Sequence, residues 1–204
     1  MLLTRYPGFR NPVLESQTTF RALLNAMAHP GRIFNVDVPV EHPTELAATS
    51  TAVCLTLFDL ETTVWLQPCF GAEVRQWLAF HTGCRMSEDA AAADFALIGN
   101  PSDMPSLLQF GTGEPETPEA STTVVVQVKQ FDRGEAVTLR GPGIQTKRAF
   151  AVKPLPVDFW AQRQAMTRDY PLGVDVMFCS DRLIAALPRT TAIEIVANPL
   201  NSEA

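Results

Sequence analysis

The sequence predicts a single-domain α/β protein whose strands form one mixed sheet. The chain has 204 residues, a length typical of one domain that buries its own core. Apolar residues make up 46% of the chain and charged residues 19%, a composition typical of globular proteins. Helical periodicity alternates with short apolar runs up to about residue 110, and strand-like runs dominate after it. We therefore expect a sandwich of helices and a mixed sheet.

The first elements are an arm and an amphipathic helix. Prolines and a glycine interrupt residues 1–13, which are expected to form an irregular N-terminal arm, and residues 14–204 then form the α/β domain. Apolar residues at helical spacing predict a helix over 16–28 with Ser16 as its N-cap. The expected apolar stripe of this helix consists of Phe20, Leu23, Leu24 and Met27.

Similar periodicities predict the elements up to residue 121. The predicted helices cover residues 44–58, 71–80 and 102–110. The predicted strands cover residues 33–38, 63–66 and 95–98. Residues 111–121, rich in Gly, Pro and Glu, are expected to form an acidic exposed loop.

The remaining elements are mostly strands. The long β-branched run over 122–131, the turn residues 132–134 and the apolar residues 136–139 together predict a β-hairpin. A helix is predicted over 157–166. Further strands are predicted over 173–179, 183–187 and 193–196, the first two flanking a turn.

Charge limits the classes of partner. The chain has 16 basic and 22 acidic residues, and thirteen of the basic residues are Arg. The net charge is +3 over residues 1–32, −11 over 33–128 and +2 over 129–204. A nucleic-acid-binding protein would show a basic stripe and a high isoelectric point, so this class is excluded. A local anion site built from Arg, or an acidic face turned toward a basic partner protein, remains open.

Cysteine usage and hydropathy indicate the compartment. None of the four cysteines lies in a C-x-x-C pair, and a chain of this size needs no disulfide, so we expect reduced thiols in a cytoplasmic protein. The start of the chain lacks the apolar core of a secretory signal. No apolar run approaches 18 residues, so no membrane span is expected.

Motifs for common cofactors are weak. The nearest metal pattern is His81-x-x-Cys84, whose more ordinary interpretation is a helix-end histidine and a buried thiol, so no metal is expected. Gly141-Pro-Gly143 is better explained as a tight turn than as a nucleotide-binding loop. No G-x-S-x-G nucleophile motif is present. None of the three lysines stands out as a Schiff-base residue, and all are expected at the surface: Lys129, Lys147 and Lys153.

The segment 188–191 is the most specific candidate for a ligand site. The planar fork of Arg189 and the hydroxyls of Thr190 and Thr191 suit a phosphate or phosphonate oxyanion. The alternative is a strand entry with a surface arginine. Asp175 lies in an apolar strand, where an acid is costly unless an arginine such as Arg189 or Arg182 pairs with it. Otherwise Asp175 lies on a solvated face of the strand.

His81 follows an apolar helix, where it is either an acid/base group near that site or a residue that interacts favourably with the helix C-terminus. The residue-based reasoning leaves both interpretations open.

The chain resembles the PhnH family, whose members are subunits of the bacterial carbon–phosphorus lyase system. The matching blocks fall in the family's order within residues 14–196. They cover residues 20–27, 30–31, 55–59, 63–66, 80–82, 111–112, 118–119, 139–144, 171–175 and 187–191.

This resemblance implies a fold like the large domain of PLP-dependent transferases, without that cofactor. It also implies a complex with the G, I and J subunits of the system, and a homodimer when the protein is isolated. Together with the G and I subunits, a PhnH protein converts ATP and an alkylphosphonate to ribose 1-alkylphosphonate 5-triphosphate and adenine. The chain is then a non-autonomous subunit of this transferase, with no established catalytic residue.

Two alternatives stay open beside this expectation. One is a purely structural docking subunit without a ligand, and the other is a stand-alone small-molecule transferase. If an anion site exists, we expect Arg189 and Thr190 to donate to the oxyanion, Asp175 to orient Arg189, and Thr191 and His81 to lie nearby. The acidic stretch 33–128 is the candidate docking face.

Overall fold

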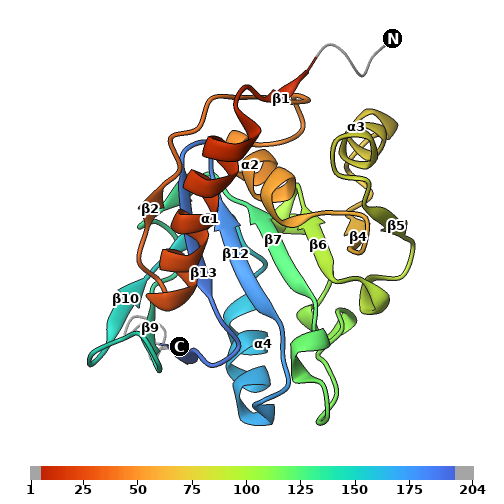
Figure 1. Ribbon diagram of the computed structural model, residues 1–204. Coiled ribbons are helices and arrows are strands. Elements are labelled where there is room, and N and C mark those ends of the chain that lie inside the picture. Colours follow the sequence, from red (N-terminus) through yellow and green to blue (C-terminus); the bar gives the residue numbers. More distant parts are fainter. Residues whose placement is uncertain (1–5, 196–204) are drawn as a thin grey trace.

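The computed structural model describes residues 6–195 and is built around a seven-stranded mixed sheet (Figure 1). The strand order is β2-β13-β12-β7-β6-β4-β5. The parallel part consists of β4 (Thr63–Leu66), β5 (Arg85–Ser87), β6 (Phe95–Ile98), β7 (Thr123–Gln127) and β12 (Asp175–Cys179). The antiparallel edge consists of β13 (Leu183–Leu187) and β2 (Phe34–Asn35).

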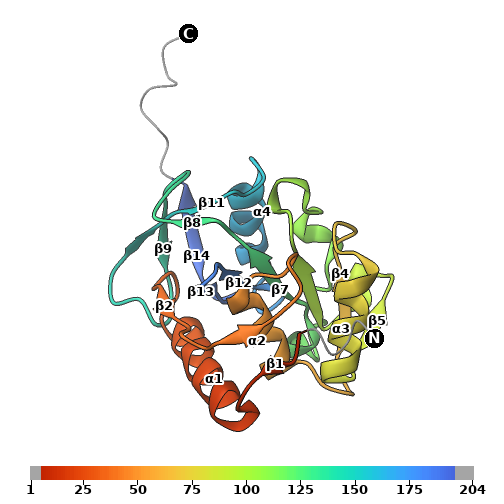
Figure 2. The ribbon, with the colours of Figure 1, turned by 90° about the horizontal axis from the view of Figure 1, so that it is seen from above.

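Helices and a second sheet cover the two faces of this sheet (Figure 2). The helices on one face are α1 (Pro12–Ala28), α2 (Ala48–Leu57) and α3 (Ala72–Thr82). The other face packs against α4 (Phe159–Met166) and a small antiparallel sheet of β9 (Val137–Arg140), β10 (Arg148–Phe150) and β14 (Ala192–Ile195). Each face has its own buried apolar cluster, and both clusters share the central strands. The predicted α/β class with a large mixed sheet is confirmed.

Short elements complete the fold. Two antiparallel ribbons pair β1 (Gly8–Phe9) with β3 (Val40–Glu41) and β8 (Gln130–Phe131) with β11 (Val152–Lys153). Single 3-10 turns occur at Ala90–Ala92, Pro101–Asp103, Leu107–Gln109, Pro118–Ala120 and Thr167–Asp169. Within residues 6–195, no helix is both long and apolar enough to cross a membrane.

The first helix differs from its prediction in two ways. It begins at Pro12, because Asn11 accepts the Leu14 N–H at 3.3 Å and proline is well suited to the first helical position. Its buried side consists of Thr19, Leu23 and Ala26, and the helix packs on β13 and α2. The predicted stripe was therefore wrong at two positions that face solvent, Phe20 (46% exposed) and Leu24 (54% exposed).

The predicted β-hairpin over 122–139 was wrong. The run Thr123–Gln127 forms β7, a central strand that pairs in parallel with β6 and β12. The three consecutive valines at 124–126 are fully buried. A strand covered on both faces requires such a continuous apolar run, whereas a hairpin with a solvated face alternates. The later strand β9 instead pairs with β10 and β14.

The other predicted helices and strands were confirmed, most with shifted boundaries, with one exception. Strands 63–66 and 95–98 appear as predicted, and the last two long strands form the expected hairpin β12-β13. The predicted helix over 102–110 is replaced by two separate 3-10 turns. The strands that were not predicted are β1, β3, β5, β10 and β11. Residue 196 of the last predicted strand lies outside the described residues.

Candidate functional site

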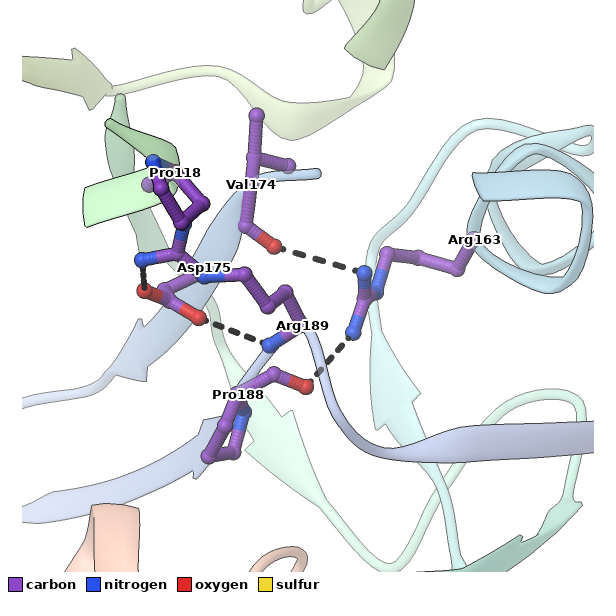
Figure 3. Close-up of polar contacts among 6 residues, drawn as sticks. All are labelled: Pro118, Arg163, Val174, Asp175, Pro188 and Arg189. Atoms are coloured by element: carbon purple, nitrogen blue, oxygen red, sulfur yellow. Dashed lines mark hydrogen bonds and ion pairs between the residues drawn. The ribbon is translucent and has the colours of Figure 1, made fainter. Parts of the chain in front are cut away.

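Asp175 pairs with Arg189, one of the two arginines that the sequence offered as its partner (Figure 3). Asp175 begins β12 and Arg189 follows β13 by two residues, and the antiparallel register, with Val176 opposite Leu187, brings Arg189 beside Asp175. The Arg189 backbone N–H donates to Asp175 Oδ1 at 2.7 Å, and Nη2 donates to Oδ2 at 2.9 Å. The side chains are only 13% and 17% exposed, so water screens this ion pair weakly.

The same guanidinium also holds the acidic loop. Arg189 Nη1 donates to the carbonyl oxygen of Pro118, in the loop that the sequence predicted over 111–121. Two of the fork's three nitrogens therefore bind protein groups (Figure 3). Beside the fork lies a shallow depression of about 210 Å³, which Thr190 lines together with Glu119. Because Glu119 contributes a carboxylate, its charge opposes the binding of an anion there.

The two threonines have different surroundings. Thr190 lines the depression, whereas Thr191 is fully buried. The Thr191 backbone N–H donates to the Pro188 carbonyl at 2.9 Å and closes a tight turn. Thr191 Oγ1 has no hydrogen-bond partner among residues 6–195.

His81 lies away from this cluster. Its helix α3 joins β4 to β5, and the strands β6 and β7 separate β4 from β12 in the sheet. The imidazole packs on Trp77 with ring centroids 4.4 Å apart, and Nε2 lies 3.2 Å from the Tyr6 carbonyl oxygen. Burial lowers the pKa of His81, and the hydrogen bond with Tyr6 opposes this shift. Gly83, with φ of 73°, forms the C-cap of the helix.

Sequence reasoning missed Arg163, which is fully buried in α4. Its Nη1 donates to the Val174 carbonyl at 3.3 Å and its Nη2 to the Pro188 carbonyl at 2.9 Å, so it bridges the chain just before β12 and just after β13. Burial lowers its pKa to about 10, and the negative charge of Asp175 opposes this shift. A signal was available, since residues 159, 163 and 166 recur at helical spacing and place Arg163 on the apolar face.

The arrangement is thus two arginines around one carboxylate. Arg163 and Arg189 hold both strand ends and one loop through backbone carbonyls, as Figure 3 shows. Such a cluster positions chain segments and carries net positive charge in a poorly solvated place. Apart from the Asp175 carboxylate, the two arginines contact only backbone carbonyls in these hydrogen bonds.

The comparisons with known proteins agree with one another. The family model described as "Bacterial phosphonate metabolism protein (PhnH)" matches residues 7–194. A protein of Rhizobium meliloti (strain 1021), named "Alpha-D-ribose 1-methylphosphonate 5-triphosphate synthase subunit PhnH", is 37% identical over 194 residues, which are 93% of this chain and 96% of that protein. A protein of Stutzerimonas stutzeri, named "Putative C-P lyase subunit protein HtxG", is 32% identical over 184 residues, 89% of this chain and 87% of that protein.

Proposed function

Since this chain belongs to the PhnH family of bacterial phosphonate metabolism proteins, we propose that it is an accessory subunit of a carbon–phosphorus lyase complex. The observation that carries the proposal is the match with the Rhizobium meliloti subunit, which is 37% identical and spans 96% of that protein. The match therefore covers nearly all of both sequences. The second relative carries a related subunit name.

The proposed role is docking rather than autonomous catalysis. With the G and I subunits, the chain supports the conversion of ATP and an alkylphosphonate to ribose 1-alkylphosphonate 5-triphosphate and adenine, and the J subunit joins the same complex. The isolated chain pairs with a second copy of itself. The compartment we propose is the cytoplasm, because Cys54, Cys84 and Cys179 are buried free thiols. The likeness to PLP-dependent transferases stays a prediction.

An exposed apolar ridge on α1 supports a docking role. Val13, Phe20 and Leu24 are 77%, 46% and 54% exposed and recur at spacings of seven and four residues, which places them on one side of the helix. The opposite side of the helix is buried on β13 and α2. Solvent-facing Phe and Leu at helical spacing favour contact with a protein partner. We assign this ridge to a companion subunit.

Co-expression with the companion subunits tests this proposal. The chain should co-migrate with them in size-exclusion chromatography, and Phe20→Ser with Leu24→Ser should abolish co-migration without lowering the midpoint of unfolding. Val157→Ser, at a residue that is 98% exposed before α4, is the matched control and should co-migrate normally. Loss of self-pairing with retained co-migration would assign the ridge to a second copy instead.

The anion site around Arg189 is a separate part of the proposal. If this site contacts substrate, Arg189→Ala in the reconstituted complex should lower activity while the complex still assembles. Because Nη1 and Nη2 already bind Pro118 and Asp175, a purely structural role predicts faster proteolysis of loop 111–121 and unchanged activity. The two outcomes distinguish a substrate contact from a structural clamp.

A further inference from the structure

A large cleft lies at the edge of the main sheet where β6 and β7 end. The cluster of Arg163, Asp175 and Arg189 lies at the opposite edge, where the parallel strand β12 begins. The volume of the cleft is about 730 Å³, within the range of small-molecule sites. Residues that directly follow β6 and β7 line it, including Asn100 and Ser102 on one side and Lys129 on the other. These two strands are parallel neighbours, so the cleft lies at their carboxyl ends.

The topology of the sheet favours a ligand at this edge. From β4 the chain passes through α3 to β5 on one side, and the next strand, β6, lies on the other side of β4. Ligands of open α/β sheets bind at the carboxyl ends of strands beside such a reversal. A second cavity of about 490 Å³ lies at the reversal itself, lined by residues after β4 and by Asn100, which lines both cavities.

Charge distinguishes this cleft from the rest of the molecule. The chain has a net charge of −6 and three lysines, and two of them, Lys129 and Lys153, line the cleft. No Asp or Glu of the described part of the chain lines it. Neither ammonium forms an ion pair or a side-chain hydrogen bond within residues 6–195. Two unpaired ammonium groups in one concave site attract an anion.

Backbone pairing holds the two lysines together before any ligand binds. Lys153 pairs with Gln130 in the ribbon of β8 and β11, and the Lys129 N–H donates to the Lys153 carbonyl at 3.0 Å. The opposite wall is fixed by Gln67, only 4% exposed, whose Oε1 accepts the Gly99 N–H at 3.0 Å and the Asn100 N–H at 2.8 Å. A preformed site loses little conformational entropy on binding.

We infer that this cleft, which we call the two-lysine cleft, binds the polyphosphate of an organic triphosphate. The two ammonium groups contact phosphate oxygens, and the neutral side chains of Ser102 and Gln130 offer hydrogen bonds without charge repulsion. The cleft and its charge are independent of the proposed function, whereas the preference for a triphosphate over other anions rests on it. The cavity that shares Asn100 gives room for the remainder of the ligand.

Isothermal titration of the isolated full-length chain tests this inference. The probes are ATP, inorganic triphosphate and methylphosphonate. ATP and triphosphate should bind, and methylphosphonate should bind much more weakly because it carries less charge. Replacing one lysine by Gln should weaken ATP binding about tenfold, and Lys129→Gln with Lys153→Gln about a hundredfold, as expected for charged hydrogen bonds.

Lys147→Gln is the matched control, because it removes the same charge from an exposed lysine that does not line the cleft. This variant should bind ATP within about twofold of the unaltered chain, since its charge lies outside the site. The inference is overturned if neither triphosphate binds, if methylphosphonate binds best, or if Lys147→Gln weakens binding as much as the cleft variants. Co-migration with the companion subunits needs no ligand, so a chain that assembles but does not bind ATP contradicts this inference alone.

Discussion

The contacts among Arg163, Asp175 and Arg189 lead to a quantitative prediction for Asp175→Asn. This change removes the negative charge between Arg163 and Arg189 while keeping the shape of the side chain. The amide can still accept the Arg189 backbone N–H at Oδ1, but its NH₂ group faces Nη2 in place of Oδ2. Fully buried Arg163 then loses the charge that compensates for its burial. The substitution therefore acts on both arginines.

The expected cost is a large fraction of the stability of a domain. Removing one partner of a buried ion pair costs about 3–5 kcal/mol. A domain of this size shifts its melting temperature by about 2–4 °C per kcal/mol, so Asp175→Asn should lower it by roughly 10 °C. Urea unfolding followed by tryptophan fluorescence measures the change, because Trp77 and Trp160 are buried. The slope of the free energy of unfolding against urea concentration should not change.

Glu194→Gln is the matched control. Glu194 forms a shorter ion pair, 2.6 Å from Arg140 Nε, but these side chains are 53% and 50% exposed. Exposed pairs contribute about 0–1 kcal/mol, so this carboxylate-to-amide change should be nearly silent. A double-mutant cycle of Asp175→Asn with Arg189→Gln should give a coupling of about 0.5–3 kcal/mol. Equal costs for Asp175→Asn and Glu194→Gln would refute the reasoning, because burial would then not matter.

Three further predictions follow from other parts of the fold. Burial lowers the pKa of His81 below the 6.5 of the unfolded chain, so the stability that neutral His81 contributes above pH 6.5 is lost as the pH falls. Between pH 7.5 and pH 5.5, the free energy of unfolding should therefore fall less for His81→Gln than for the unaltered chain. An equal fall in both proteins would contradict this prediction. Among the four thiols only Cys69 is exposed, so a disulfide reagent should label one thiol quickly in the native protein, and labelling of a second at the same rate would be inconsistent with the fold. Gly143 has a φ of 79°, and an added Cβ would lie 2.1 Å from the Ala28 carbonyl oxygen, so Gly143→Ala should cost at least about 2 kcal/mol in urea unfolding. Gly71→Ala, where the nearest atom would be 3.4 Å away, should be nearly neutral, and similar costs at both positions would contradict this explanation.

The sequence predicted the elements whose local pattern matches their burial. Strands 63–66 and 95–98 are short apolar runs, and both lie in the sheet at the predicted residues. The long run over 123–127 was identified as a strand, but its partners were not, because β12 lies about fifty residues later in the chain. Pairing between distant strands leaves no local signal, and the continuous valines were the only indication of burial on both faces.

The candidate site shows the same limit. An arginine partner for Asp175 was one of the open interpretations, because an acid in an apolar strand needs a nearby cation, but the sequence did not decide between Arg189 and Arg182. The confirmed hairpin of β12 and β13 brings Arg189 to Asp175. Arg163 was missed although its helix was predicted, since an arginine on an apolar face is ordinarily explained by a solvated head group. Lys129 and Lys153 were expected at the surface, and their convergence depends on the β8-β11 ribbon, which the sequence did not predict.

Subunit association tests the central claim most directly. The chain would be co-expressed with its proposed companion subunits G, I and J, purified through a tag on the I subunit, and analysed by size-exclusion chromatography with light scattering. The account predicts that this chain elutes with the tagged subunit in a fixed ratio, and that omitting it abolishes release of adenine from ATP and methylphosphonate. Elution of this chain alone, together with unchanged adenine release in its absence, would contradict the account.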